Sequence, residues 1–285
     1  MQFRSLRGYL PDPSRFPKKI VTMKNFKLHM LYSGSRGNSA LVRVGDVSIL
    51  IDAGKTERAL CRALCEVGED IKNIKAIFIT HEHVDHISAL EMISQKYDIP
   101  IYMTERSAQK LAEDSPIRKN LCERTLVFCE EIDGVRVRSF ATPHDSLACV
   151  GYRIEFDDER GTHALGYATD LGTVDNNVWA GFNGCEVIVV EANHDTDMLM
   201  TGPYPYYLKQ RIQSNDGHLS NEICAKLCGA LVKNGTKAIM LAHLSEDNNL
   251  HDLAKNAVRE AIADESVSVC VARQNETVEL VIPQN

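Results

Sequence analysis

The chain has 285 residues, of which 44% are hydrophobic, so it can bury a sizeable core as one large domain or as two small ones. Its formal net charge of -7 argues against a broadly basic surface that binds nucleic acid regardless of sequence, because that mode of binding needs clustered lysines and arginines. No apolar run reaches the length of a membrane span, and no signal-peptide pattern opens the chain. Nine cysteines without a C-x-x-C pair fit a reducing compartment, so we expect a cytoplasmic protein.

The order of the predicted elements points to one domain with two sheets. Residues 1–22, with three prolines among basic and polar residues, are predicted to form an extended lead, and residues 23–285 a single domain. Apolar periodicity predicts, in chain order, strands 27–33, 40–44 and 47–52, helix 56–67, strand 76–79, helix 87–97, strands 99–103, 126–128, 135–140, 150–156 and 163–168, a short helix near 174–179, strand 187–190, helix 221–232, strand 238–241, helix 250–263, and strands near 267–271 and 277–282. Two groups of strands, each with helices, predict an α/β fold built as a four-layer αββα sandwich.

The segment from Thr80 to His86 is the strongest chemical signal in the chain. It follows the predicted strand 76–79 and has the spacing H-x-H-x-D-H, which places four metal-ligand side chains within six positions: His81, His83, Asp85 and His86. Imidazole and carboxylate are the usual ligands of zinc and similar ions, and four of them exceed what one tetrahedral ion that keeps a catalytic water can use. The spacing therefore predicts two metal ions. The alternative is a loop of surface histidines.

Three further candidate ligands follow the ends of other predicted strands. His144 comes after strand 135–140, Asp170 after strand 163–168, and His243 after strand 238–241. Loops at strand ends are where a rigid scaffold presents functional side chains. A lone histidine such as His144 is more often a hydrogen-bonded core or surface residue, but the four candidate ligands at residues 81–86 favour the interpretation of His144 as a further metal ligand.

This arrangement resembles the metallo-β-lactamase superfamily over roughly residues 27–282. Asp52 in Ile51-Asp52-Ala53-Gly54 matches the first motif of that superfamily, an acid that supports the metal loop. The resemblance implies two divalent ions, for which Zn²⁺, Mn²⁺ and Fe²⁺ are all compatible with His and Asp ligands. By the same resemblance one ion is held by His81, His83 and His144, the other by Asp85, His86 and His243, and Asp170 bridges the two.

Two motifs and two spacings indicate which branch of the superfamily is closest. Glu191-Ala192-Asn193 and Gly217-His218-Leu219-Ser220 resemble motifs of the transfer-RNA 3′-end processing branch, in which an acid orients a histidine that binds no metal and assists the leaving oxygen. Asp170 follows His144 by only 26 positions, which leaves no room for the long substrate-binding arm of those enzymes. His243 follows Asp170 by only 73 positions, too few for the inserted cap domain of the ribonuclease J and cleavage-factor branch.

Further family-like motifs lie at residues 32–39, 80–83, 191–195, 204–205, 208–212, 217–221, 243–245 and 248–249. With them the chain looks most like the YycJ/WalJ group, small cap-less members of the superfamily described as DNA exonucleases. It implies a DNA substrate, single-stranded or at an end, degraded with a polarity that the sequence does not decide, 5′ to 3′ being one option. Candidate substrate contacts are Ser35, Asn38, Lys209 and Arg211.

Two of these substrate segments have structural alternatives. Two glycines in the loop 33–38 let backbone N–H groups turn toward an anion, although a plain β-turn is at least as compatible with the sequence. Segment 204–211 interleaves three tyrosines with Lys209 and Arg211, which predicts either stacking of bases on a single strand or an amphipathic helix with its tyrosines packed inward.

We therefore expect hydrolysis of a phosphodiester by a water molecule activated between the two ions, with Asp85 orienting that water as well as binding metal. His218, oriented by Glu191, is expected to protonate the departing oxygen. A cyclic or small phosphodiester is an alternative substrate for the same site. Two alternatives come from other classes of function. A thioester or lactam hydrolase would need neither Glu191 nor His218, and a non-catalytic binding protein would typically lack one or more of the seven ligands, all of which this chain has.

Overall fold

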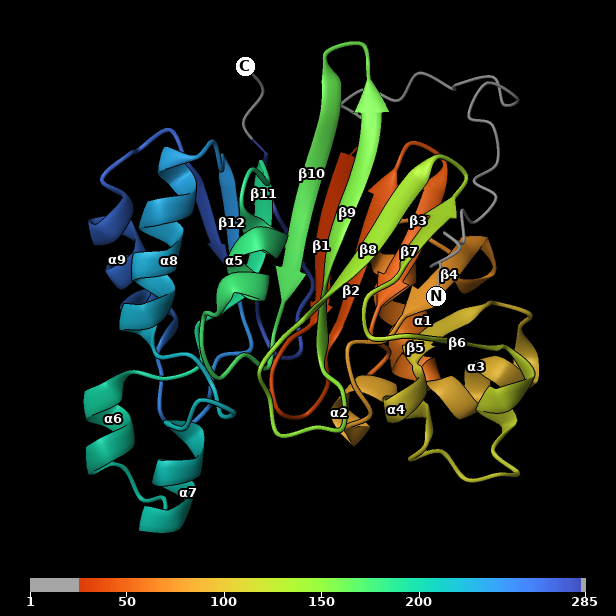
Figure 1. Ribbon diagram of the computed structural model, residues 1–285, viewed down its shortest axis with the longest axis horizontal. Coiled ribbons are helices and arrows are strands. Elements are labelled where there is room, and N and C mark those ends of the chain that lie inside the picture. The colour runs from red at the N-terminus through yellow and green to blue at the C-terminus, as the bar shows by residue number, and fades with distance from the viewer. Residues whose placement is uncertain (1–25, 283–285) are drawn as a thin grey trace, which may run out of the picture.

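A computed structural model of the chain describes residues 26–282, in which two seven-stranded sheets lie between layers of helices (Figure 1). The first sheet, in spatial order, contains β14 (Val278–Glu279), β1 (Phe26–Tyr32), β2 (Ser39–Val44), β3 (Val47–Ile51), β4 (Ile74–Phe78), β5 (Ile101–Thr104) and β6 (Leu121–Arg124). The second contains β13 (Ser268–Val271), β12 (Ala238–Ala242), β11 (Val187–Glu191), β10 (Gly161–Ala168), β9 (Val150–Asp158), β8 (Val135–Ala141) and β7 (Cys129–Ile132). The predicted αββα sandwich is confirmed.

Apart from β14, which pairs antiparallel with β1 at the edge of the first sheet, both sheets follow one plan, in which antiparallel strands precede parallel ones along the chain. In the first sheet β1, β2 and β3 pair antiparallel, and β3 to β6 then pair parallel. In the second, β7 to β10 pair antiparallel, and β10 to β13 then pair parallel. The carboxyl ends of parallel strands meet at one edge of a sheet, which is where open α/β sheets carry their ligands.

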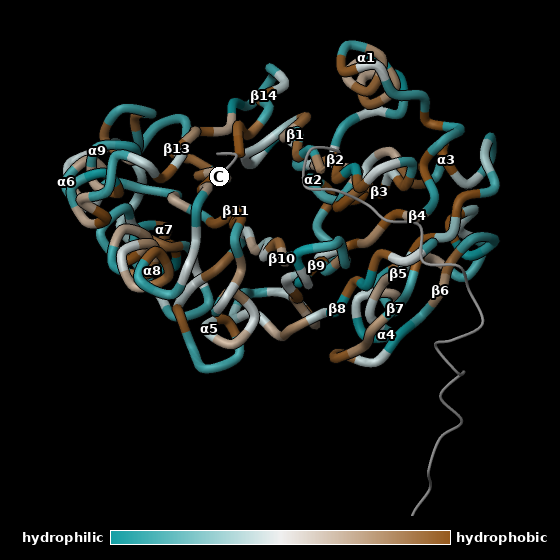
Figure 2. The backbone as a smooth tube through the Cα atoms, turned by 90° about the horizontal axis from the view of Figure 1, so that it is seen from above, coloured by the Kyte–Doolittle hydropathy of each residue, from teal (hydrophilic) through white to brown (hydrophobic). Residues whose placement is uncertain are grey.

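The hydrophobic core has three parts that define the four layers. Between the sheets pack large side chains from both, including Met30, Phe78, Tyr152 and Met240. The outer face of the first sheet is covered by α1 (Glu57–Glu66), α3 (Leu90–Lys96) and α4 (Glu105–Ala108). The outer face of the second is covered by α5 (Asn176–Phe182), α8 (Asn221–Lys233) and α9 (His251–Ile262), as Figure 2 shows from above.

Local signals set several boundaries where the sequence places them. The two residues between predicted strands 40–44 and 47–52, Gly45 and Asp46, join β2 to β3 as a hairpin turn with Val44 opposite Val47, and Gly45 has the positive φ that such a turn requires. Helix α8 begins after Ser220, whose Oγ accepts a hydrogen bond from the backbone N–H of Ile223.

Some local predictions were wrong. Residues 126–128 form no strand, because they belong to the connection that carries the chain from β6 in one sheet to β7 in the other. Strand β6 itself was not predicted, and neither were α4 and α6 (Thr196–Thr201). Helix α7 (Tyr206–Ile212) corresponds to the helix that was one alternative for segment 204–211. The extended lead predicted for residues 1–22 lies outside the described residues. Within residues 26–282 no helix is long and apolar enough to cross a membrane.

The predicted helix 87–97 is divided into α2 (Val84–Ile87) and α3 because backbone hydrogen bonds hold the chain to neighbouring loops. The backbone N–H of Asn38 donates to the carbonyl of Asp85, and that of Ala53 donates to the carbonyl of His86, both at 2.8 Å. The N–H of Ala89 returns a bond to the carbonyl of Ala53 at 2.9 Å. These bonds fix α2, and with it the histidine run, against the ends of β1 and β3.

Candidate active site

The predicted ligands lie at the carboxyl ends of strands from both sheets, on the lower edge of the molecule in Figure 1. The first sheet contributes the loop after β4 and helix α2, which carry His81, His83, Asp85 and His86. The second contributes the loops after β8, β10 and β12, which carry His144, Asp170 and His243. The two halves of the centre therefore come from the two halves of the sandwich.

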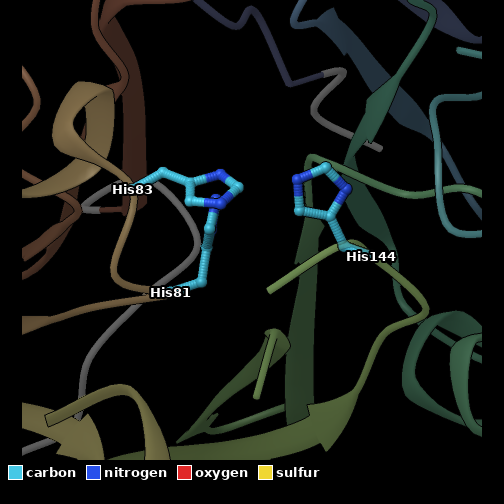
Figure 3. A group of neighbouring side chains, drawn as sticks. All are labelled: His81, His83 and His144. Atoms are coloured by element: carbon cyan, nitrogen blue, oxygen red, sulfur yellow. The ribbon is translucent and has the colours of Figure 1, made fainter. Parts of the chain in front are cut away.

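The first group of candidate ligands consists of three imidazoles that converge from opposite sides. One ring nitrogen of each of His81, His83 and His144 lies within 4.8 Å of those of the other two. Figure 3 shows His81 and His83 on one side and His144 opposite, with the rings facing a common point. Imidazole nitrogens at this separation fit a single ion with a position left for another ligand.

The second group contains Asp85, His86 and His243, again within 4.8 Å of one another. Asp170 lies between the groups. Its Oδ2 is 3.2 Å from Nε2 of His86, and its Oδ1 is 3.5 Å from Nε2 of His243 and 3.7 Å from Nε2 of His144. The carboxylate thus faces both groups, as a bridging ligand must.

Four of the histidines have Nδ1 beside a hydrogen-bond acceptor. Nδ1 of His81 lies 3.0 Å from Oγ1 of Thr80, and Nδ1 of His144 lies 3.2 Å from the carbonyl of Gly217. The corresponding partners are the Asp52 carboxylate for His86, at 2.9 Å, and the Glu191 carboxylate for His243, at 2.7 Å. With the proton on Nδ1, each ring directs the lone pair of Nε2 into the centre.

Buried polar atoms without partners show that this donor set fits cations. Among the described residues, Nε2 of His81, Nε2 of His243 and Oδ2 of Asp170 are buried and accept or donate no hydrogen bond. Such atoms are costly unless something binds them. Burial, followed by neighbouring His86, holds the pKa of His81 well below its usual value, so this imidazole is neutral and can bind a metal.

The backbone is strained at three of these positions. Asp52, Asp170 and His243 each have a positive φ, of 60°, 55° and 56°, although none is glycine. Each follows directly or closely on a strand end, where the chain turns away from the sheet. Strain of this kind persists only when surrounding contacts impose it, and it concentrates at functional sites.

Glu191 orients a histidine pair instead of offering a metal ligand. Its Oε1 accepts from Nδ1 of His218 at 2.9 Å and from Nδ1 of His243 at 2.7 Å. Its Oε2 accepts from the backbone N–H groups of Leu171 and Leu219, both at 2.9 Å. A carboxylate has about four acceptor positions, and all are used. Glu191, His218, Asp170 and His243 do lie close enough for a metal, but Glu191 has no lone pair to spare.

The charges of this pair are tightly linked. Burial opposes ionisation of Glu191, yet His218 and His243 together lower its pKa to about 2. Burial likewise opposes protonation of His218, but Glu191 and then Asp170 raise its pKa to about 9. His218 is therefore an imidazolium at neutral pH in the ion-free protein. Its side chain is 20% exposed, so substrate can reach it.

A pocket of about 190 Å³ opens beside His218 and His243. Its lining includes two of the four predicted substrate contacts, Ser35 and Arg211. Lys209 lies elsewhere, because its Nζ donates to the carbonyls of Met200 and Gly202 at 2.7 and 2.8 Å.

Asn38 is fully buried beneath the metal ligands and does not line this pocket. Its Nδ2 lies 3.3 Å from Oδ2 of Asp85 and 3.0 Å from Nε2 of His86, and its Oδ1 accepts from the N–H of Gly34. The loop 33–38 closes as a turn, with the N–H of Gly37 donating to the carbonyl of Gly34 at 2.9 Å. The N–H groups of both glycines, Gly34 and Gly37, are therefore bound within the loop, as in the β-turn alternative.

Sequence analysis did not assign roles to Thr80 and Asp145. Oγ1 of Thr80 lies 2.9 Å from the Asp52 carboxylate and 3.0 Å from Nδ1 of His81, so it links the buried acid to the first ligand. Oδ1 of Asp145 lies 3.2 Å from Nε2 of His144, and its Oδ2 accepts from Nε of Arg211 at 2.6 Å. Thr80 directly precedes His81 in the sequence and Asp145 directly follows His144, and this adjacency to a predicted ligand could have identified both.

Comparison with known proteins agrees with this geometry. The Beta-lactamase superfamily domain matches residues 48–244. Exodeoxyribonuclease WalJ of Streptococcus pneumoniae serotype 2 is 32% identical over 250 residues, which cover 86% of this chain and 91% of WalJ. Exodeoxyribonuclease YycJ of Bacillus anthracis is 32% identical over 244 residues, which cover 84% of this chain and 90% of YycJ.

Among solved structures, the metallo-beta-lactamase fold protein YhfI from Bacillus subtilis matches with a TM-score of 0.65 at 17% identity, over 89% of this chain and 98% of YhfI, and so shows the likeness of fold. The family domain spans more than half of the chain, and the curated relatives align over most of their own length. The chain accordingly belongs to the metallo-β-lactamase superfamily, as a metal-dependent hydrolase related to the WalJ and YycJ exodeoxyribonucleases.

Proposed function

We propose that the protein is a phosphodiesterase that degrades DNA from an end and uses two divalent metal ions. One observation carries the proposal. Four histidines held through Nδ1 and one carboxylate converge on a common centre, and beside them lies a charged histidine, His218, that is bound to Glu191 and not placed as a metal ligand. A lactam or thioester hydrolase has no need of such a group, whereas a departing alkoxide needs a proton donor.

The two groups of neighbouring ligand atoms support the division that the family resemblance implies. His81, His83 and His144 would hold one ion, Asp85, His86 and His243 the other, and Asp170 both. Two such ions supply Lewis acidity and a nucleophilic water at neutral pH, and Zn²⁺, Mn²⁺ and Fe²⁺ all suit this donor set. Asp85, whose side chain is one-quarter exposed, also orients the attacking water.

His218 acts on the leaving oxygen. Its Nδ1–H is held by Glu191, so the opposite ring nitrogen can donate a proton into the pocket. Because the pKa of His218 is about 9 in the ion-free protein, the proton is present there at neutral pH. Glu191 keeps the ring in place and compensates its charge, and the two backbone N–H groups that donate to its other oxygen fix the carboxylate itself.

The proposed substrate is DNA because both relatives with long alignments are exodeoxyribonucleases. Ser35 and Arg211 line the pocket and are placed to bind a phosphate there. A net charge of -7 means that such contacts are local and few. An end of a single strand fits this arrangement better than a continuous duplex.

The volume of the pocket favours a second candidate, a small or cyclic phosphodiester. About 190 Å³ is less than the roughly 300 to 1,000 Å³ of pockets that enclose a whole drug-sized ligand. Such a substrate would use the same ligands and His218, so only direct comparison of substrates separates the two proposals.

The test compares end-labelled single-stranded DNA, double-stranded DNA, RNA, a cyclic nucleotide, bis-p-nitrophenyl phosphate and a chromogenic lactam, each with Zn²⁺ or Mn²⁺ and with chelator. We expect mononucleotides from DNA, and early release of a 5′ label would establish 5′ to 3′ polarity. Faster turnover of the cyclic nucleotide would favour the second candidate. Turnover of the lactam alone would refute both.

A further inference from the structure

Helices α6 and α7 form an excursion that projects from the sandwich beside the site (Figure 1). No residue of α7 is buried, which is unusual for a helix in a folded domain. Its tyrosines Tyr206 and Tyr207 are 68% and 74% exposed. The alternative in which these tyrosines pack inward is therefore wrong, and the two rings have no structural role in the core.

The exposed helix is nevertheless held in place. Lys209 ties α7 to the end of α6 through the carbonyls of Met200 and Gly202. The hydroxyl of Tyr204 donates to Asp247 at 2.8 Å, and the N–H of His218 donates to the carbonyl of Ile212 at 2.9 Å. Because the last of these bonds reaches the catalytic histidine, α7 has a fixed position relative to the reaction centre.

Helix α7 also forms one wall of the pocket. Leu208, Arg211 and Ile212 line it together with His218 and His243. Tyr207 precedes Arg211 by four residues, so the two side chains lie on one face of the helix, one turn apart. A strand whose phosphate contacts Arg211 would pass its neighbouring bases over the exposed rings.

We propose that Tyr206 and Tyr207 form a stacking platform for the bases of a single-stranded DNA whose end enters the pocket. This inference rests on the proposed nuclease function and specifies how the polymer is held. Stacking on aromatic rings tolerates any base sequence and contributes about 1 to 3 kcal/mol per base. It requires few positive charges, which suits a chain with a net charge of -7.

The experiment measures the KM for a single-stranded oligonucleotide in Tyr206→Ala, Tyr207→Ala and the double variant, each compared with Tyr→Phe at the same positions. Each alanine variant should raise the KM roughly 5- to 150-fold, and phenylalanine should largely restore it, because it keeps the ring. Hydrolysis of bis-p-nitrophenyl phosphate, which cannot span the pocket and the platform, should be unchanged. Met200→Ala, which removes a 46% exposed side chain without a ring from the same excursion, is the matched control.

An oligonucleotide with abasic positions next to the scissile bond separates stacking from other effects. The wild type should bind it more weakly than the normal strand, and the alanine variants should bind both strands alike. The inference is overturned if the alanine variants keep the wild-type KM, if they discriminate against the abasic strand as the wild type does, or if the substitutions instead abolish self-association in sedimentation experiments. A wild type that cleaves only small diesters would refute the DNA proposal itself.

Discussion

The two halves of the metal centre are built differently. The first sheet supplies four candidate ligands within six residues, in one loop and the short helix α2 after β4. The second sheet supplies three candidate ligands from separate strand ends, His144, Asp170 and His243, together with Glu191 and His218, which bind no metal. A local run needs only one strand to be placed correctly, whereas the dispersed half requires that β10, β11 and β12 pair in register.

The buried acids that support each half also differ. Asp52 receives the N–H and hydroxyl of Thr80 and Nδ1 of His86, and burial raises its pKa despite the nearby imidazole. Glu191 receives two backbone N–H groups and two imidazoles, and its pKa falls to about 2. The difference lies in the number of imidazoles: His218 and His243 both lower the pKa of Glu191, whereas the single imidazole of His86 does not offset the effect of burial on Asp52.

Substitution of Asp170, which faces the ligands of both halves, should have the largest effect on activity. Asp170→Asn removes the charge between the two ligand groups, and we expect activity to fall by about 10³-fold or more, because metal ions stabilise the transition state by several kcal/mol. Metal content measured by mass spectrometry should fall as well. Asp98→Asn, at a 92% exposed side chain, is the control. Retention of both ions and full activity would contradict the bridging role.

His218→Ala tests the part of the second half that binds no metal. We expect kcat to fall about 10²- to 10⁴-fold with metal content unchanged. His218 must be protonated to act as the acid, so the wild-type kcat should decline as pH rises toward its pKa of about 9. Bound cations repel the imidazolium and lower this pKa, so in the metal-loaded protein the decline should begin at a lower pH.

This alkaline decline should be absent in His218→Ala. His251→Ala, an exposed histidine at the start of α9, serves as the control for loss of an imidazole. A variant that keeps both the rate and the alkaline decline would exclude His218 as the acid.

The supporting acids can be compared directly by Asp52→Asn and Glu191→Gln. Each should weaken metal binding about 10- to 100-fold in titrations against a chelator. Glu191→Gln should have the larger effect, since an amide cannot accept from all four donors that surround this position. A larger loss of metal affinity in Asp52→Asn than in Glu191→Gln would show that the single imidazole contact of Asp52 contributes more to metal binding than the four hydrogen bonds of Glu191.

The opposite end of β10 should govern stability instead of catalysis. Burial opposes protonation of His163, but Glu186 and Asp158 at 2.5 and 2.9 Å raise its pKa above 6.5. Its stabilising contribution is therefore fully present below pH 6.5 and is lost as pH rises through the folded-state pKa.

His163→Gln should lower the free energy of unfolding by about 1 to 3 kcal/mol near pH 6 and by less at pH 9, measured by denaturant titration. Activity per folded molecule should not change. An equal loss of stability at both pH values would contradict the charged state assigned to His163.

The smallest effect is expected from the ion pair at the mouth of the pocket. Arg211 is 62% exposed and bound to Asp145, so Asp145→Asn should free the guanidinium for phosphate and lower the KM for single-stranded DNA by up to about fivefold. Because Asp145 also lies 3.2 Å from Nε2 of His144, metal content must be shown to be unchanged. An increased KM would mean that the pair positions Arg211 for substrate.

The sequence alone determined the sandwich, most strands and the compact histidine run, because each depends on local periodicity or on ligands a few residues apart. The folded structure decided the rest. Asn38 lies beneath the ligands through contacts with residues 47 or more positions away. Lys209 is tied to the preceding helix at Met200 and Gly202, and Tyr206 and Tyr207 are exposed, although the local pattern allowed both to be placed otherwise. No local pattern specifies how many donors meet Glu191, since those donors come from three separate loops that only sheet pairing brings together.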